Sequence, residues 1–125
     1  MAKKRVFISY DYDHDKGMKE LASGYAKRPD SPYEIIDFST KLSTPEKDWI
    51  EKARKAISQA DVFMLMLGPK TKKTAGVLKE LKIATELKIM TIQIIGYKFG
   101  TEDWAVPGGG NVYKWDWEAL KKLLA

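Results

Sequence analysis

Two apolar runs, Val62–Leu67 and Met90–Ile95, dominate the hydrophobic pattern of the chain. Neither run alternates regularly with polar residues, so both are expected to be strands covered on both faces of a parallel sheet. Gly68-Pro69 ends the first run, and an amphipathic stretch follows and continues to about Lys88. The pattern predicts a strand, a helix and a second strand over residues 61–95.

The rest of the chain alternates between strand and helix patterns in the same way. The expected elements are a strand at 5–9, a helix from Asp15 to about residue 27, a strand at 33–38, a helix that starts at Pro45 with Thr44 as its cap, and a last helix capped by Asp116. Between Ile95 and the last helix, the glycines and Pro107 predict a long loop with room for a short strand near 111–113.

This alternation predicts an α/β fold in which a parallel sheet of four or five strands carries helices on both faces. A chain of 125 residues suits the flavodoxin-like three-layer sandwich with strand order 2-1-3-4-5. Residues 1–125 are expected to form a single domain, because a chain of this length builds one core of ordinary size.

The predicted strand order also locates a site. In this order the winding reverses between the first and third strands, and ligands bind beyond the C-terminal ends of those strands. Ser9 and Tyr10 follow the first strand, and Lys70 and Thr71 follow the third. These four strand-end residues are therefore candidate ligand contacts.

The helix after the third strand carries two carboxylates that differ in direction. Counting about 100° per residue from Val77, Glu80 falls at roughly 300°, inside the apolar arc that includes Leu78 and Leu81, and Glu86 falls at roughly 180°, outside it. An inward carboxylate costs several kcal/mol if it stays charged and unpaired. Helix geometry alone leaves two explanations for Glu80, a structural ion pair or a functional site.

Composition narrows the choice of partners. The net charge of +5 comes from lysines scattered among acidic residues, and the densest basic run, around Lys72, lies at a strand end where a small anion fits better than a duplex. This argues against a nucleic-acid partner. The chain has no cysteine and one histidine, His14, so we expect no disulfide, no metal and no bound cofactor. No apolar run suits a signal peptide or a membrane span, which predicts a cytoplasmic protein.

The sequence lacks the residues that several activities found on this fold require. The third strand ends in Leu67-Gly68 without the carboxylate of a phosphoacceptor domain, and neither GxGxxG nor GxxxxGK[ST] follows a strand. His14 lies in a polar run, DYDHDKG, which is typical of an exposed loop. What remains is one inward carboxylate near hydroxyls and aromatics. Such a site suits cleavage of an N-glycosidic bond with a good leaving group, such as the nicotinamide of NAD, because one carboxylate can stabilise the positive charge that develops.

The order of several short motifs resembles that of TIR-like domains, in particular the small bacterial and archaeal branch that includes the TIR proteins of Thoeris anti-phage systems. The matching segments are residues 5–10 (RVFISY), 60–62 (ADV), 68–71 (GPKT), 74–81 and 115–118 (WDWE). Together they extend over about residues 4–122.

In that family a Ser or Thr, a Trp two residues later and a catalytic Glu four residues after the Trp open the third helix. The corresponding residues here are Thr74, Gly76 and Glu80. The resemblance implies that Glu80 cleaves NAD, as substrate rather than cofactor, into nicotinamide and ADP-ribose or a cyclic ADP-ribose signal. The four strand-end residues would then line the ribose and phosphate path.

The resemblance also implies partners: self-association or contact with other TIR-like chains, a separate effector protein, and a role in antiviral defence signalling. Gly76 removes the expected aromatic wall, and this favours the alternative of a non-catalytic TIR-like interaction module. Trp49 occupies an apolar helical position and is interpreted as a core residue rather than a ligand stack. Residues 39–44 fall where the family has a loop beside the nucleotide pocket, although a plain connection is an equal interpretation.

Overall fold

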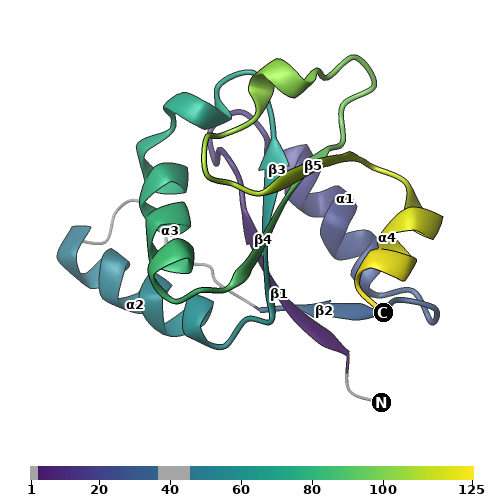
Figure 1. The fold of residues 1–125 in the computed structure, drawn as a ribbon, viewed down its shortest axis with the longest axis horizontal. Helices are drawn as coiled ribbons and strands as arrows, with labels where there is room; N and C mark the ends of the chain where they lie inside the picture. The colour runs from purple at the N-terminus through teal and green to yellow at the C-terminus, as the bar shows by residue number, and fades with distance from the viewer. Residues whose placement is uncertain (1–2, 37–45) are drawn as a thin grey trace.

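The computed structural model describes residues 3–36 and 46–125 (Figure 1). Its five strands form one parallel sheet in the order β2-β1-β3-β4-β5, which confirms the predicted flavodoxin-like α/β fold. The elements are β1 (Lys4–Ser9), α1 (Lys16–Ala26), β2 (Tyr33–Ile35), α2 (Glu46–Ser58), β3 (Val62–Leu67), η1 (Thr71–Lys73), α3 (Ala75–Glu86), β4 (Met90–Ile95), η2 (Glu102–Trp104), β5 (Asn111–Lys114) and α4 (Trp117–Leu123).

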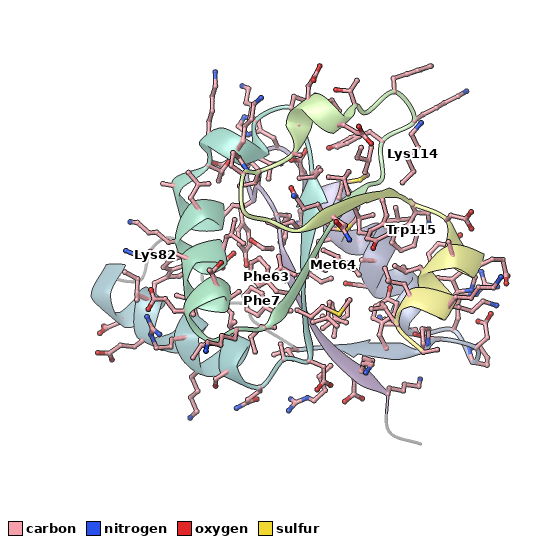
Figure 2. All side chains as sticks on the ribbon, viewed as in Figure 1. Phe7, Phe63, Met64, Lys82, Lys114 and Trp115 are labelled. Atoms are coloured by element: carbon pink, nitrogen blue, oxygen red, sulfur yellow. The ribbon has the colours of Figure 1, made fainter. Side chains whose placement is uncertain are left out.

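Helices cover both faces of the sheet, with α2 and α3 on one side and α1 and α4 on the other (Figure 1). Each side has its own apolar cluster because successive side chains of a strand point to opposite faces. Phe7 and Phe63 stack on the α2–α3 side with ring centroids 5.6 Å apart, while Met64 packs toward α1 and α4 (Figure 2). All six residues of β3 are buried, as its unbroken apolar run predicts.

The strand register brings the loops that follow β1, β3 and β4 to the same end of the sheet, where the parallel strands have their C-termini. Ser9 pairs with Leu65, and Leu67 pairs with Ile95, so the chain leaves β1, β3 and β4 at nearby points. The sequence predicts a ligand site at this C-terminal end of the sheet.

The fifth strand is paired along its whole length with β4, where the sequence predicts a long loop with at most a short strand. The buried side-chain amide of Gln93 explains the position of β5. The side chain of Gln93 donates to the carbonyl oxygens of Val106 and Gly110, at 3.2 and 3.0 Å, and accepts from the backbone N–H of Val106 at 2.7 Å. Gln93 therefore anchors the segment that leads into β5.

The amphipathic stretch predicted to continue to about Lys88 forms two elements. The short η1 contains Thr71, and α3 begins after Thr74 and ends at Glu86. The described part of the second strand ends at Ile35. Ile36 lies beyond the strand, and the rest of the predicted extension to residue 38, the loop at 39–44 and the helix start at Thr44-Pro45 lie outside the described residues. Within residues 3–36 and 46–125, no helix has the length and apolar character needed to cross a membrane.

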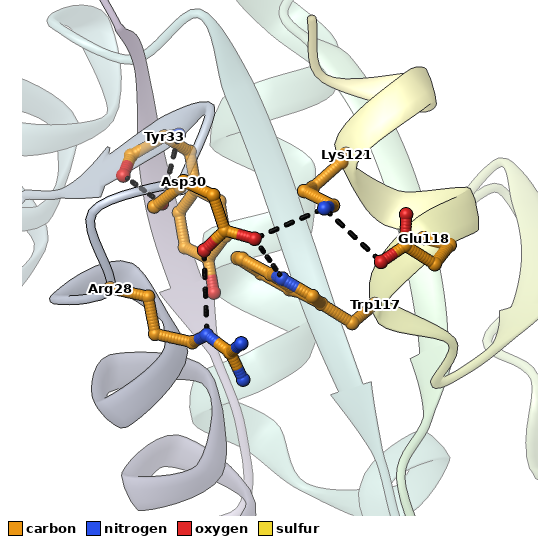
Figure 3. A network of polar contacts seen from close by, with 7 residues as sticks. Arg28, Asp30, Tyr33, Trp117, Glu118 and Lys121 are labelled. Carbon is orange, nitrogen blue, oxygen red and sulfur yellow. Dashed lines mark hydrogen bonds and ion pairs between the residues drawn. The ribbon is translucent and has the colours of Figure 1, made fainter.

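The C-terminal helix is tied to the turn before β2 by Asp30 (Figure 3). One carboxylate oxygen of Asp30 accepts from the indole of Trp117 and from the ammonium of Lys121, both at 3.0 Å, and the other lies 3.4 Å from Arg28. The bonds from Trp117 and then Lys121 lower the pKa of Asp30 to about 2. The charged form of Asp30 therefore stabilises the fold.

We expect Asp30→Asn to lower the melting temperature at neutral pH, because asparagine keeps the shape and loses the charge. Since the folded pKa of Asp30 lies below the unfolded one, its stabilisation is complete above the unfolded value of 3.8 and is lost as the pH falls to about 2. The difference between wild type and variant should shrink over that window in thermal scans. Asp48→Asn, at an exposed position of α2, is the control. A difference that does not depend on pH would contradict this account.

Candidate active site

Ser9 and Glu80 meet in the interior beside the C-terminal end of β1. The Ser9 hydroxyl donates to Glu80 Oε1 at 2.6 Å, and the two residues are 1% and 4% exposed. Ser9 is the last residue of β1, and Glu80 lies in the second turn of α3. Two residues predicted separately from the strand order and from the helix phase thus form one buried pair.

The packing of α3 explains why Glu80 points inward. The buried residues of α3 are Val77, Glu80, Leu81, Ile83 and Ala84. The prediction that Leu78 lies on the buried side is wrong, since Leu78 is 40% exposed. The buried arc is rotated toward Ile83, which places Glu80 near its centre. Glu86 is exposed, as predicted, and its carboxylate lies 3.3 Å from Arg54.

Burial makes Glu80 a weaker acid than an exposed glutamate. Removal of its carboxyl group from water raises the pKa of Glu80 to about 8, although the hydrogen bond from Ser9 acts in the opposite direction. A raised pKa in a cavity is a mark of functional sites, because structural carboxylates are more often paired with cations. Among the hydrogen bonds and ion pairs of the described residues, Glu80 has Ser9 as its partner and no cation.

Glu80 lies on the wall of a small cavity of about 60 Å³. The described residues that line this cavity are Tyr10, Asp11, Tyr12, Asp13, Trp49, Thr74, Gly76, Val77 and Glu80. They include three carboxylates and neither lysine nor arginine. The described lining of the cavity that contains Glu80 is therefore acidic.

Aromatic rings border the cavity from two elements. Tyr10 and Tyr12, in the loop after β1, contact each other with ring centroids 4.6 Å apart. Trp49 comes from α2 and is 7% exposed. The sequence predicts a core residue at this position, and Trp49 is buried; it also lines the Glu80 cavity, with its ring beside Gly76.

The other two strand-end residues are placed differently. Thr71 is fully buried, and its hydroxyl accepts the backbone N–H of Gly68 at 2.7 Å, so it closes the turn after β3. Lys70 is exposed in that turn. Neither belongs to the described lining of the Glu80 cavity, and their contact with a ligand stays a prediction.

The sequence did not single out a second buried carboxylate, Asp15. The hydroxyl of Tyr97, which follows β4, donates to one oxygen of Asp15, and the other oxygen lies against Gly68 with no hydrogen-bond partner among the described residues. Asp11 is also buried and accepts from the exposed His14 at 2.7 Å, if the ring nitrogen carries the proton. The only sequence signal for buried carboxylates in this segment is the density of aspartates in DYDHD, and that pattern equally suits an exposed loop.

A larger hollow of about 500 Å³ lies between α1 and β2 and shares Tyr10 with the Glu80 cavity. The one carboxylate in its described lining, Glu34, is exposed, so we do not place a reaction centre there. In the described part of the chain, no group of three or more His, Cys, Asp or Glu side chains is arranged to hold a metal ion.

Comparisons with known proteins agree with this fold. A family model described as Thoeris protein ThsB, TIR-like domain, matches residues 7–101. No curated protein matches the sequence. Among solved structures, the chain is similar to a Clostridium botulinum CMP N-glycosidase, BcmB, with a TM-score of 0.59 and 19% sequence identity over 96% of this chain and 97% of that one. At this identity, the structural likeness supports the fold alone.

Proposed function

Because the chain belongs to the family of Thoeris ThsB TIR-like domains, we propose that it cleaves the bond between nicotinamide and ribose in NAD, with Glu80 as the catalytic residue. The observation that carries the proposal is the buried Ser9–Glu80 pair in an acidic cavity. A binding module has no use for a buried carboxylate that lacks a cation partner, as Glu80 does among the described residues, since such burial lowers stability.

The charge of the cavity supports a cationic substrate group. The nicotinamide ring of NAD is a pyridinium and carries a positive charge, whereas a neutral nucleobase does not. Asp11 and Asp13 lie on the same wall as Glu80, and each would attract that ring. The same lining disfavours phosphate, so the phosphates of the substrate must lie outside the cavity. Lys70, exposed at the end of β3, is the proposed contact for them.

In the proposed reaction, the bond between ribose C1′ and the nicotinamide nitrogen breaks, and its electron pair neutralises the pyridinium. The ribose is left as an oxocarbenium ion, which the Glu80 carboxylate stabilises from within a site of low dielectric constant. Water then adds to C1′ and releases a proton, which gives ADP-ribose; attack by an adenine nitrogen instead gives a cyclic product. No metal is required for either route.

The protonation state of Glu80 links binding to catalysis. In the empty protein, a pKa of about 8 keeps most of Glu80 neutral at pH 7. A pyridinium held nearby favours the charged form and lowers this pKa. A cationic substrate therefore helps to generate the carboxylate that the reaction needs.

Incubation of concentrated protein with NAD, followed by chromatography of the products, tests the proposal. We expect nicotinamide together with ADP-ribose or a cyclic isomer. Because kcat/KM reports the free enzyme, it should rise about tenfold per pH unit below pH 8 and level off above it. CMP belongs in the same assay, since the solved structure of similar fold is that of a CMP N-glycosidase.

Two outcomes would redirect the proposal. Release of cytosine from CMP, with NAD untouched, would assign a nucleotide N-glycosidase. Consumption of neither compound, at any protein concentration, would favour the non-catalytic interaction module. Self-association, a separate effector protein and antiviral defence signalling are further parts of the proposal; specific activity that rises with protein concentration would support self-association.

A further inference from the structure

We infer that Trp49 is the aromatic wall of the Glu80 cavity and that the cationic nicotinamide ring stacks on its face. This inference rests on the proposed function and names the residue that would position the leaving group. Trp49 comes from α2, whereas Glu80 comes from α3. The wall and the carboxylate would thus be supplied by two helices on the same face of the sheet (Figure 1).

Trp49 is buried like a core residue and also borders the Glu80 cavity. Its side chain is 7% exposed, yet within the described residues it belongs to neither of the two apolar clusters that form the core. It lines the cavity together with Glu80. A large aromatic residue that lines a cavity offers part of its surface to whatever fills that cavity.

Gly76 lies directly beside this ring. A Cβ atom at position 76 would lie 3.8 and 3.9 Å from Trp49 Cζ2 and Cη2, two carbons of the six-membered ring. These are ordinary van der Waals distances, so a methyl group would fit there. The indole from α2 therefore packs against α3 at the point where α3 borders the cavity.

The chemistry of the cavity indicates what stacks there. Indole is the aromatic side chain that attracts cations most strongly through its face. The carboxylates of Asp11 and Asp13 in the lining add attraction for positive charge. A flat cation is the ligand that satisfies both features, and a pyridinium is such a cation.

The test uses protein labelled with 5-fluorotryptophan, which gives one fluorine signal for each of the four tryptophans. The signal that disappears in Trp49→Phe identifies Trp49. The probe is 1-methylnicotinamide, a pyridinium that has no ribose and so is not cleaved, with neutral nicotinamide as its control. We expect 1-methylnicotinamide to shift the Trp49 signal at lower concentrations than nicotinamide, and to leave the Trp115 and Trp117 signals in place.

Kinetics supply the second readout. Trp49→Leu keeps an apolar side chain without a ring and should raise KM for NAD about tenfold, which is within the range for loss of one base–aromatic stack. Trp49→Phe keeps a ring and should stay within about threefold of wild type. Circular dichroism checks that both variants fold. The double variant Trp49→Ala/Gly76→Trp moves the ring to α3 and should bind NAD better than Trp49→Ala alone.

The outcomes separate this inference from the proposed function. If NAD is cleaved but the Trp49 signal does not move and Trp49→Leu keeps the wild-type KM, the inference fails and the proposed function stands. If the Trp49 signal shifts with 1-methylnicotinamide but NAD is never cleaved, the cation-binding wall stands and the proposed function fails. If NAD is not cleaved and the Trp49 signal does not shift, the inference and the proposed function are both wrong.

Discussion

Replacing Glu80 with glutamine is expected to reduce NAD cleavage by about 100-fold or more, because the amide cannot stabilise a developing positive charge. Glutamine has nearly the same shape and can still accept the hydrogen bond from Ser9, so the cavity should persist. Turnover measured by nicotinamide release is the readout. A variant that keeps more than about a tenth of wild-type turnover would remove Glu80 from the catalytic role.

The same substitution should increase stability, and the gain should depend on pH. The folded pKa of Glu80, about 8, lies above the unfolded value of 4.5, so the contribution of Glu80 to wild-type stability is greatest below pH 4.5 and falls as the pH rises to about 8. Glutamine does not titrate, and the difference between variant and wild type should therefore grow by about 1.4 kcal/mol per pH unit at most across this window. Urea unfolding at pH 5 and pH 8 measures it.

Glu86→Gln is the matched control on the same helix. Glu86 is exposed and paired with Arg54 at the surface, so its replacement should change stability by no more than about 0.5 kcal/mol and leave turnover intact. Equal effects of the two substitutions would contradict the assignment of Glu80 to the inner face of α3.

Gly110→Ala should be among the most destabilising single substitutions in the β4–β5 connection. Gly110 has a φ of +84°, and a Cβ there would fall well inside van der Waals contact with the backbone carbonyl oxygen of Thr91. Backbone of a paired strand cannot move aside cheaply. We expect a loss of roughly 3 kcal/mol or more in the free energy of unfolding, which combines left-handed strain with this clash.

Gly108→Ala separates the two causes. Gly108 has a φ of +83°, almost the same as Gly110, but a Cβ there would meet no atom within 4 Å. Its replacement should cost only the conformational strain, about 1–2 kcal/mol. If the two alanine variants unfold at the same denaturant concentration, the contact with Thr91 is not the cause of the larger loss.

Strong local patterns were sufficient for much of the fold. The apolar runs of β3 and β4 have no alternation, and two such strands joined by a helix have few alternatives to a parallel βαβ unit. The inward direction of Glu80 also followed from helical phase. The exposure of Leu78 could not be predicted, because apolar residues occupy most of the circumference of α3 and only its neighbours determine which of them are covered.

Features that depend on distant partners were missed or underestimated. Four residues of β5 give a weak strand pattern, and their pairing depends on the Gln93 amide, which contacts backbone 13 and 17 residues later. Asp15 is buried and accepts a hydrogen bond from Tyr97, which is 82 residues away. Trp49 was interpreted from its own helix, and its place beside Gly76 arises only when α2 packs on α3.

The acidic lining of the cavity also bears on how a reaction cycle would end. In the proposed reaction the substrate ring is a cation before cleavage and a neutral molecule after it, while Asp11, Asp13 and Glu80 remain where they were. The electrostatic attraction that holds the ring is therefore lost in the step that detaches it. Nicotinamide would then leave readily and expose one face of the ribose. Water or the adenine nitrogen would therefore attack C1′ after the leaving group has left the cavity.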